Sequence, residues 1–70
     1  MTRLSQHDVI LAWLNLYPKE GLTPALAFKH LACLRLAARI AELRAEGFNI
    51  ETRMETRGGK TYARYFLVRS

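Results

Sequence analysis

The strongest constraint on the fold lies in the second half of the chain, where a helical pattern runs directly into a hairpin pattern. Leu34 to Gly47 has apolar residues at helical spacing and ends in a glycine, the residue that most readily adopts the left-handed conformation after a helix. Residues 48–56 and 61–68 alternate as strands do, and Gly58-Gly59 suits a two-residue turn with positive φ at both positions. The sequence therefore predicts a helix followed by a two-stranded antiparallel ribbon.

The two-residue turn also predicts which residues of the ribbon lie opposite one another. One face, which we expect to pack on the core, pairs Ile50 with Leu67, Thr52 with Tyr65, Met54 with Ala63, and Thr56 with Thr61. The other face pairs Glu51 with Phe66, Arg53 with Arg64, Glu55 with Tyr62, and Arg57 with Lys60. Two pairs of this second face are like-charged, which destabilises a free hairpin by roughly a few tenths of a kcal/mol. A bound phosphate chain would relieve that repulsion.

Two shorter helical patterns occupy the first half of the chain. Ser5 and Asp8 have the spacing of a capping box, and the pattern that follows ends at Pro18. Thr23 before Pro24 is a second start signal, because the hydroxyl caps the helix and proline loses no helical hydrogen bond at the first turn. The expected helices therefore run from about Gln6 to Tyr17, from Pro24 to His30 and from Leu34 to Glu46.

The apolar residues of these three segments define the expected core. The first helix contributes Val9, Ile10, Trp13, Leu14 and Tyr17. The second contributes Leu26 and Ala27 with Leu31, or Phe28 with Leu31, and the third contributes Leu36, Ala37, Ile40 and Leu43. Trp13, Tyr17 and Phe28 are interpreted as core aromatics, because helical spacing explains them without a stacking role. The expected fold class is α+β, with a three-helix core and a C-terminal hairpin.

The positive charge of the chain is concentrated in its second half. The net charge is +5, and the isoelectric point is near 10.0. From Lys29 to Ser70 there are nine Lys and Arg residues against four Glu, whereas the preceding residues sum to zero. This balance favours phosphate-bearing or other acidic partners, although a basic surface alone would also suit an anionic membrane.

Length and residue types argue against several classes of function. Seventy residues form one modest core with little room for an active-site cleft. No motif assembles a nucleophile, a base and an orienting group, so we expect no enzyme and no small-molecule substrate. One cysteine and two widely separated histidines offer no metal-ligand spacing, so neither a metal nor a cofactor is expected. No linker or internal repeat divides the chain, which we expect to form one module over residues 1–70.

The single cysteine and the distribution of apolar residues bear on the compartment of the protein and on membrane association. Cys33 is the single cysteine and has no partner for an internal disulfide, which favours a reducing compartment. The polar start of the chain argues against a signal peptide, and no apolar run approaches the ~18 residues needed to span a bilayer. The basic helix also lacks the large aromatic face of an interfacial helix. We expect a cytoplasmic protein or, in a nucleated cell, a nuclear one.

Several segments resemble a family of small winged helix-turn-helix domains found in phages and prophages. They are Leu22-Thr23-Pro24, Arg35-Leu36-Ala37-Ala38-Arg39-Ile40, Leu43-Arg44-Ala45-Glu46-Gly47-Phe48-Asn49-Ile50-Glu51-Thr52, and Ala63-Arg64-Tyr65. The resemblance covers the chain from about Ser5 to Leu67, and its second and third segments are the most specific. It implies a three-helix core with a C-terminal hairpin, called the wing, and DNA binding.

Candidate base-reading residues lie near the start of the third helix, the helix that enters the major groove in this architecture. Arg35 and Arg39 are four residues apart and share a face, while the small Ala38 between them would let the helix sit deep in the groove. Arginine also matches the O6 and N7 acceptors of guanine. The alternative is a solvated helix face in which an arginine pairs with Glu42.

Candidate phosphate contacts lie at the end of the second helix and along the wing. They are Lys29, His30, Arg53, Arg57, Gly58, Gly59, Lys60, Tyr62 and Arg64. For Lys29 and His30 the alternative is a favourable interaction with the helix dipole, and for the wing tip it is solubility alone. Cys33 could touch a base edge, but a small buried thiol that fills the turn before the third helix is the favoured interpretation.

Two functions from different classes remain open from the sequence. The first is binding of double-stranded DNA by a transcriptional regulator or recombination accessory factor, as a homodimer or through cooperative neighbours, because so small a domain makes few contacts. The second is a protein-interaction module on the same scaffold that does not read DNA. The dependence of nucleic-acid affinity on salt separates the two.

Overall fold

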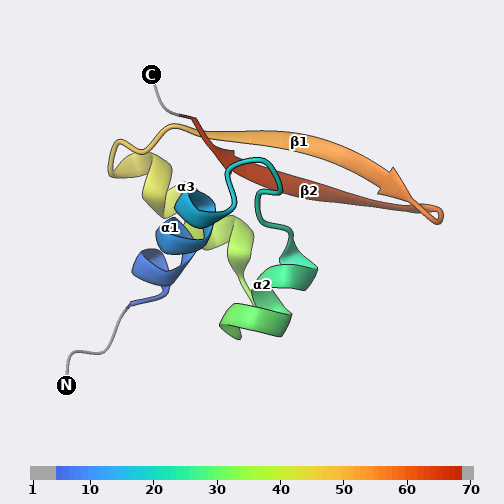
Figure 1. Ribbon diagram of the computed structural model, residues 1–70, viewed down its shortest axis with the longest axis horizontal. Helices are drawn as coiled ribbons and strands as arrows, with labels where there is room; N and C mark the ends of the chain where they lie inside the picture. The colour runs from blue at the N-terminus through green and yellow to red at the C-terminus, as the bar shows by residue number, and fades with distance from the viewer. Residues whose placement is uncertain (1–4, 69–70) are drawn as a thin grey trace.

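A computed structural model describes residues 5–68 of the chain, so the outer limits of the expected 1–70 module lie outside the described residues. Three helices are followed by a two-stranded antiparallel hairpin that projects from them (Figure 1). The elements are α1 (Gln6–Leu16), α2 (Pro24–Leu31), α3 (Leu36–Ala45), β1 (Ile50–Arg57) and β2 (Lys60–Leu67). The expected α+β class and order of elements are confirmed.

The caps of the first two helices are those that the sequence predicts. The Ser5 hydroxyl accepts from the backbone N–H of Asp8, and the Asp8 carboxylate accepts from the backbone N–H of Ser5. The Thr23 hydroxyl accepts from the backbone N–H of Leu26, with Pro24 at the first helical position. Both caps satisfy amide donors that a helix start leaves without intrahelical partners.

The core lies where the three helices meet the base of the hairpin. Its buried side chains are Ile10, Leu14, Leu22, Ala27, Cys33, Leu36, Ile40, Leu43, Ile50 and Tyr65. Cys33 is therefore the buried thiol of the favoured interpretation, and its Sγ lies 3.8 Å from the side-chain oxygen of Gln6. Leu26 and Leu31 pack against this cluster, which selects the first of the two predicted packings of α2.

Three residues expected in the core lie at its edge or outside it. Tyr17 is 40% exposed, because it follows the last residue of α1. Its ring packs on that of Trp13. Phe28 is 53% exposed, because it is one residue, about 100° of helix, beyond the buried Ala27. Ala37 is exposed for the same reason beside the buried Leu36. Only Trp13 of the three predicted core aromatics packs against the cluster.

The third helix begins two residues later than predicted. Ala32 ends α2 in the left-handed conformation, with φ of 51°, and the chain stays non-helical until Arg35, which precedes the first helical residue, Leu36. This reorientation places Cys33 in the core and leaves Leu34 81% exposed. A helix running through Leu34 would not make this turn.

The register of the hairpin is the predicted one at all eight pairs, from Ile50 opposite Leu67 to Arg57 opposite Lys60. Gly58 and Gly59 have φ of 58° and 78°, as a two-residue turn with positive φ requires. The predicted core face is only partly buried, because the ribbon extends beyond the helices (Figure 1). Its outer members, Thr52, Met54, Thr56 and Thr61, are exposed.

An isolated backbone bridge fixes the hairpin to the connection between α1 and α2. Leu22 and Tyr65 exchange two backbone hydrogen bonds of 2.9 Å in an antiparallel bridge. Gly21 precedes this bridge with φ of 69°, and a Cβ at this position would lie 2.4 Å from the carbonyl oxygen of Tyr65. Close approach of the α1–α2 connection to β2 therefore requires glycine here, and it sets the position of the wing relative to α2.

Candidate nucleic-acid interface

The start of α3 borders a shallow hollow of about 420 Å³. It is lined by Pro24, Leu34, Arg35, Leu36, Ala37 and Ala38. Arg35 is exposed and lies just before the helix, while Ala38 is half-buried. A small side chain beside an exposed guanidinium is what a helix start needs to approach the edges of bases closely.

Arg39 is held more tightly than Arg35. Its Nη1 donates to Oε1 of Glu42 at 2.8 Å, which is the ion pair that the sequence offered as the alternative to base reading. The Arg39 side chain is 31% exposed, and its Nε is buried without a hydrogen-bond partner among the described residues. Part of the Arg39 guanidinium is therefore already engaged by a carboxylate of the same helix.

His7 extends this ion pair to α1. Its Nε2 lies 2.6 Å from Oε1 of Glu42, and its Nδ1 lies 3.4 Å from Oε2 of Glu46. The hydrogen bond from His7, together with the positive charge of Arg39, lowers the pKa of Glu42 below its ordinary value of 4.5. His7 and Glu42 are 35 residues apart, so sequence reasoning, which depended on local spacing, did not find this cluster.

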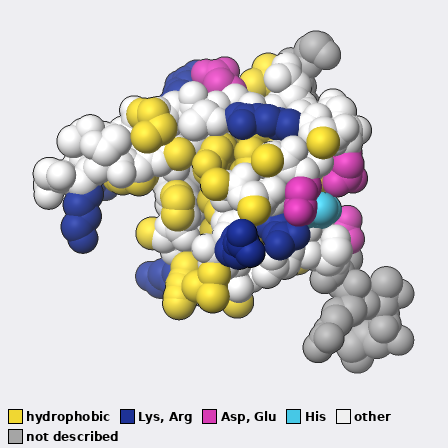
Figure 2. Space-filling model, turned by 180° about the vertical axis from the view of Figure 1, so that it is seen from behind, with side chains coloured by type: hydrophobic (Ala, Val, Ile, Leu, Met, Phe, Trp, Pro, Cys, Tyr) yellow, Lys and Arg dark blue, Asp and Glu magenta, His cyan; other side chains and the backbone are white. Residues whose placement is uncertain are grey.

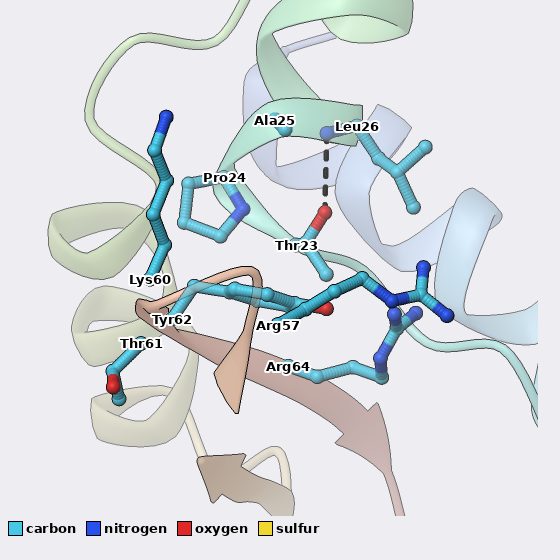
Figure 3. A pocket seen from close by; sticks show the side chains of 9 residues that line it. All are labelled: Thr23, Pro24, Ala25, Leu26, Arg57, Lys60, Thr61, Tyr62 and Arg64. Carbon is cyan, nitrogen blue, oxygen red and sulfur yellow. Dashed lines mark hydrogen bonds between the residues drawn. The ribbon is translucent and has the colours of Figure 1, made fainter. Parts of the chain in front are cut away.

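A larger hollow of about 550 Å³ lies between the start of α2 and the tip of the wing (Figure 3). The helix contributes Thr23, Pro24, Ala25 and Leu26, and the wing contributes Arg57, Lys60, Thr61, Tyr62 and Arg64. Arg57 and Lys60 are exposed and flank the Gly58-Gly59 turn. These two cations remain accessible to an acidic ligand.

Arg64, a predicted phosphate contact, makes hydrogen bonds within the protein. Its Nε donates to Oε2 of Glu55 at 2.9 Å, and its Nη1 donates to the backbone oxygen of Glu20 at 2.6 Å. Tyr62 donates its hydroxyl to the other Glu55 oxygen at 3.1 Å. The hydrogen bond from Arg64 lowers the pKa of Glu55 below 4.5. Because Glu20 lies outside the hairpin, Arg64 joins the wing to the α1–α2 connection.

Each arginine of the like-charged pair Arg53 and Arg64 has a carboxylate partner in the hairpin, Glu51 for Arg53 and Glu55 for Arg64. The Nε of Arg53 donates to Glu51 at 2.9 Å, and its guanidinium lies 4.9 Å from the centre of the Phe66 ring. The expectation that a phosphate chain relieves their repulsion stays a prediction. Arg53 still has a side chain that is 64% exposed, whereas that of Arg64 is 21% exposed.

Lys29 and His30 lie in the last turn of α2, where positive charge suits the helix dipole. The ring of His30 stacks on Trp13 with the centroids 5.3 Å apart. Neither residue lines the hollows at α3 or at the wing.

The two hollows adjoin, because Pro24 lines both. Arg35 and Ala38 line the hollow at α3, and Arg57 and Lys60 line the hollow at the wing. Figure 2 shows Lys and Arg side chains in dark blue near the middle of one face, with another hanging from the projecting hairpin. The start of α3 and the tip of the wing therefore contribute to one continuous surface.

A family model described as a winged helix-turn-helix domain matches residues 5–70. The chain belongs to the winged helix-turn-helix family. No curated protein gives a significant match, and no solved structure does. In this family β1, β2 and their turn are the wing, and α2 and α3 form the helix-turn-helix. Winged helix-turn-helix domains generally bind DNA and are typical of non-enzymatic proteins.

Two further structural observations bear on what this winged helix-turn-helix domain does. Within residues 5–68, no helix combines the length and the apolar character needed to cross a membrane. The same residues contain no group of three or more His, Cys, Asp or Glu side chains placed to hold a metal ion.

Proposed function

We propose that this winged helix-turn-helix domain binds double-stranded DNA, with the start of α3 in the major groove and the wing on the adjacent backbone. The observation that carries the proposal is the continuous surface on which Arg35, Arg57 and Lys60 are exposed around Pro24. Arg35 and Arg39 read bases, and Ala38 allows close approach of the helix. At the wing tip, Arg57, Lys60 and the Gly58-Gly59 turn between them contact phosphates. Arg53 and Lys29 add charge at the margins.

The proposal extends to the biological role. The segment Arg35-Leu36-Ala37-Ala38-Arg39-Ile40 and the segment 43–52 resemble phage and prophage domains, which supports a phage or bacterial regulator of transcription or an accessory factor in recombination. Such a protein works in the cytoplasm, where the DNA is. The whole chain, residues 1–70, acts as one module, and two copies or cooperative neighbours supply the contacts that one small domain lacks.

Selection from random duplexes tests the proposal directly. The wild type and the variants Arg35→Ala, Arg39→Ala and Lys60→Ala are each used to enrich bound sequences. We expect either arginine variant to lose preference at one or two base positions, because a bidentate contact with guanine contributes about 1–3 kcal/mol of discrimination. Lys60→Ala should weaken all sequences about equally. Identical enrichment by all four proteins would exclude the assignment of α3 to the groove.

The dependence of affinity on salt supplies an independent measurement. Neutralisation of about five phosphates gives a slope of log K against log salt of roughly −4 to −5, and Lys60→Ala should reduce its magnitude by about one. The alternative function, a protein-interaction module, predicts weak binding without sequence preference. One observation favours it: an apolar hollow lined by Leu14, Asn15, Pro18 and Leu67 shares no residue with the cationic surface.

A further inference from the structure

Leu34 is the most exposed large hydrophobic side chain that the structure describes, at 81% of its surface. It lies between two buried neighbours, Cys33 and Leu36, which are 2% and 3% exposed. The chain is anchored on both sides of Leu34, because Cys33 and Leu36 both belong to the core cluster. The fold thus holds an apolar side chain outward at a fixed place in front of α3.

The surroundings of Leu34 are apolar on one side and cationic on the other. Pro24, Ala37 and Ala38 line the same hollow as Leu34, and Arg35 is the only charged residue among the side chains lining it. A ligand that fills the hollow must offer an apolar group within reach of a guanidinium.

The thymine methyl group in the major groove meets both requirements. It is the one apolar group that a base pair presents there, and it lies beside the oxygen and nitrogen acceptors of neighbouring bases. A second copy of the chain would fit less well, because each copy brings its own Arg35 to the contact. The +5 net charge of the chain likewise favours the polyanion over a like-charged surface.

We infer that Leu34, with Pro24 and Ala37, forms an apolar site that reads a thymine methyl group next to the base contacted by Arg35. The inference rests on the proposed function and deepens it, because it names a base-specific contact that the arginines alone do not supply. Leu34 makes this contact by burial and not by hydrogen bonding. Removal of the methyl group should therefore change affinity without changing the phosphate contacts.

Substitution of thymine by deoxyuridine isolates the methyl group. The duplex enriched by the wild type is resynthesised with each thymine replaced in turn by deoxyuridine, and affinities are measured for the wild type and Leu34→Ala. At one position the replacement should weaken wild-type binding about fourfold, the effect of burying one carbon group of this size. Leu34→Ala should bind the thymine duplex several-fold more weakly and should not distinguish it from the deoxyuridine duplex.

Leu16→Ala is the matched control, since Leu16 is 73% exposed at the end of α1 and lines neither hollow. It should retain the wild-type response to deoxyuridine, and both leucine variants should unfold at the wild-type temperature. An enriched site without thymine, or an equal response in wild type and Leu34→Ala, overturns the thymine site while DNA binding stands. A change of oligomeric mass in Leu34→Ala alone also overturns it in favour of a contact between copies. Absence of any enriched duplex overturns the proposed function itself.

Discussion

Arg35 and Arg39 carry the same guanidinium group in different environments. Arg35 is exposed before the first turn of α3, whereas Arg39 is paired with Glu42 and is partly buried. Water screens an exposed ion pair of this kind, so under the proposed function DNA acceptors can replace Glu42 as the partner of Arg39. Arg35 is therefore available to bind a ligand without rearrangement, whereas Arg39 must give up its contact with Glu42.

Glu42 links acid stability to the contact between α1 and α3. Its pKa is lowered by the hydrogen bond from His7 and by Arg39, so the stabilisation is complete above pH 4.5 and is lost as the pH falls through the lower folded-state pKa. The melting temperature of the wild type should exceed that of Glu42→Gln at neutral pH, and the difference should shrink below about pH 4.5.

The control for this prediction is Glu20→Gln. The carboxylate of Glu20 makes no hydrogen bond or ion pair with any described residue. The melting temperature of Glu20→Gln should therefore change with pH as that of the wild type does. Thermal unfolding followed by circular dichroism from about pH 7 to about pH 3 measures all three proteins. A wild-type advantage over Glu42→Gln that persists unchanged at the acidic end would contradict the role given to this carboxylate.

Alanine substitutions at Gly21 and Gly47 test whether the close approach of the α1–α2 connection to β2 requires glycine at position 21. Both have positive φ, but a Cβ at Gly21 would meet Tyr65 and Phe66, whereas a Cβ at Gly47 would meet nothing within 4 Å. Gly47→Ala should reduce the free energy of unfolding by about 1–2 kcal/mol, the conformational term. Gly21→Ala should reduce the free energy of unfolding by about 1–3 kcal/mol more than this, because the added Cβ overpacks the Leu22–Tyr65 bridge. Equal losses in urea denaturation would show that the bridge tolerates displacement.

At the scale of elements, the orientation of the wing depends on few contacts. Arg64 reaches from β2 to the backbone oxygen of Glu20, and Glu55 and Tyr62 hold its other side. The Leu22–Tyr65 bridge adds backbone hydrogen bonds to the same junction. Beyond this junction the ribbon makes contact mainly with itself, so the position of Lys60 follows from how firmly the base of the wing is held.

A double-mutant cycle separates positioning by Arg64 from direct phosphate contact. Arg64→Met keeps an unbranched side chain as far as the position of Nε and removes the guanidinium. If Arg64 acts through the wing, Lys60→Ala should weaken DNA binding less in the Arg64→Met background than in the wild type, with a coupling of about 0.5 kcal/mol or more. Two independent phosphate contacts would instead give additive losses.

Arg53→Met is the matched control for this cycle. The partners of Arg53 are Glu51 and Phe66, which both belong to the hairpin, so this arginine does not join the wing to the helices. Its substitution should therefore be additive with Lys60→Ala within about 0.3–0.5 kcal/mol. Equal coupling for both arginines would point to a general effect on the hairpin.

Sequence reasoning was most accurate where structure depends on neighbours in the chain. Gly58-Gly59 and the alternation beside it determine the register, because pairing in a hairpin propagates from its turn. The start of α3 was misplaced, since Ala32 adopts a left-handed φ of 51° that its residue type does not signal. The predicted burial of one face of the wing was wrong for another reason. Met54 lies on the predicted face of the strand, but that part of the strand extends beyond the helices.

The candidate site shows the same division. Arg35, Arg57 and Lys60 were identified because charge and position along an element are visible in the sequence. The His7 and Glu42 contact was missed, because its members are distant in the chain. The contact of Arg64 with the backbone oxygen of Glu20 was also missed, because it joins residues that are distant in the chain.

At the scale of the whole molecule, shape limits how much DNA one copy covers. The longest dimension is 42 Å, and base pairs of B-DNA are about 3.4 Å apart along each strand, so one copy spans about 12 base pairs. Titration of a long duplex should saturate at no more than about 12 base pairs per chain. If two copies act together, the selected site should contain inverted halves centred about 10 base pairs, one helical turn, apart. Saturation at half this length per chain would mean that only half of the copies touch DNA. A single uninterrupted site shorter than one turn would exclude the paired arrangement.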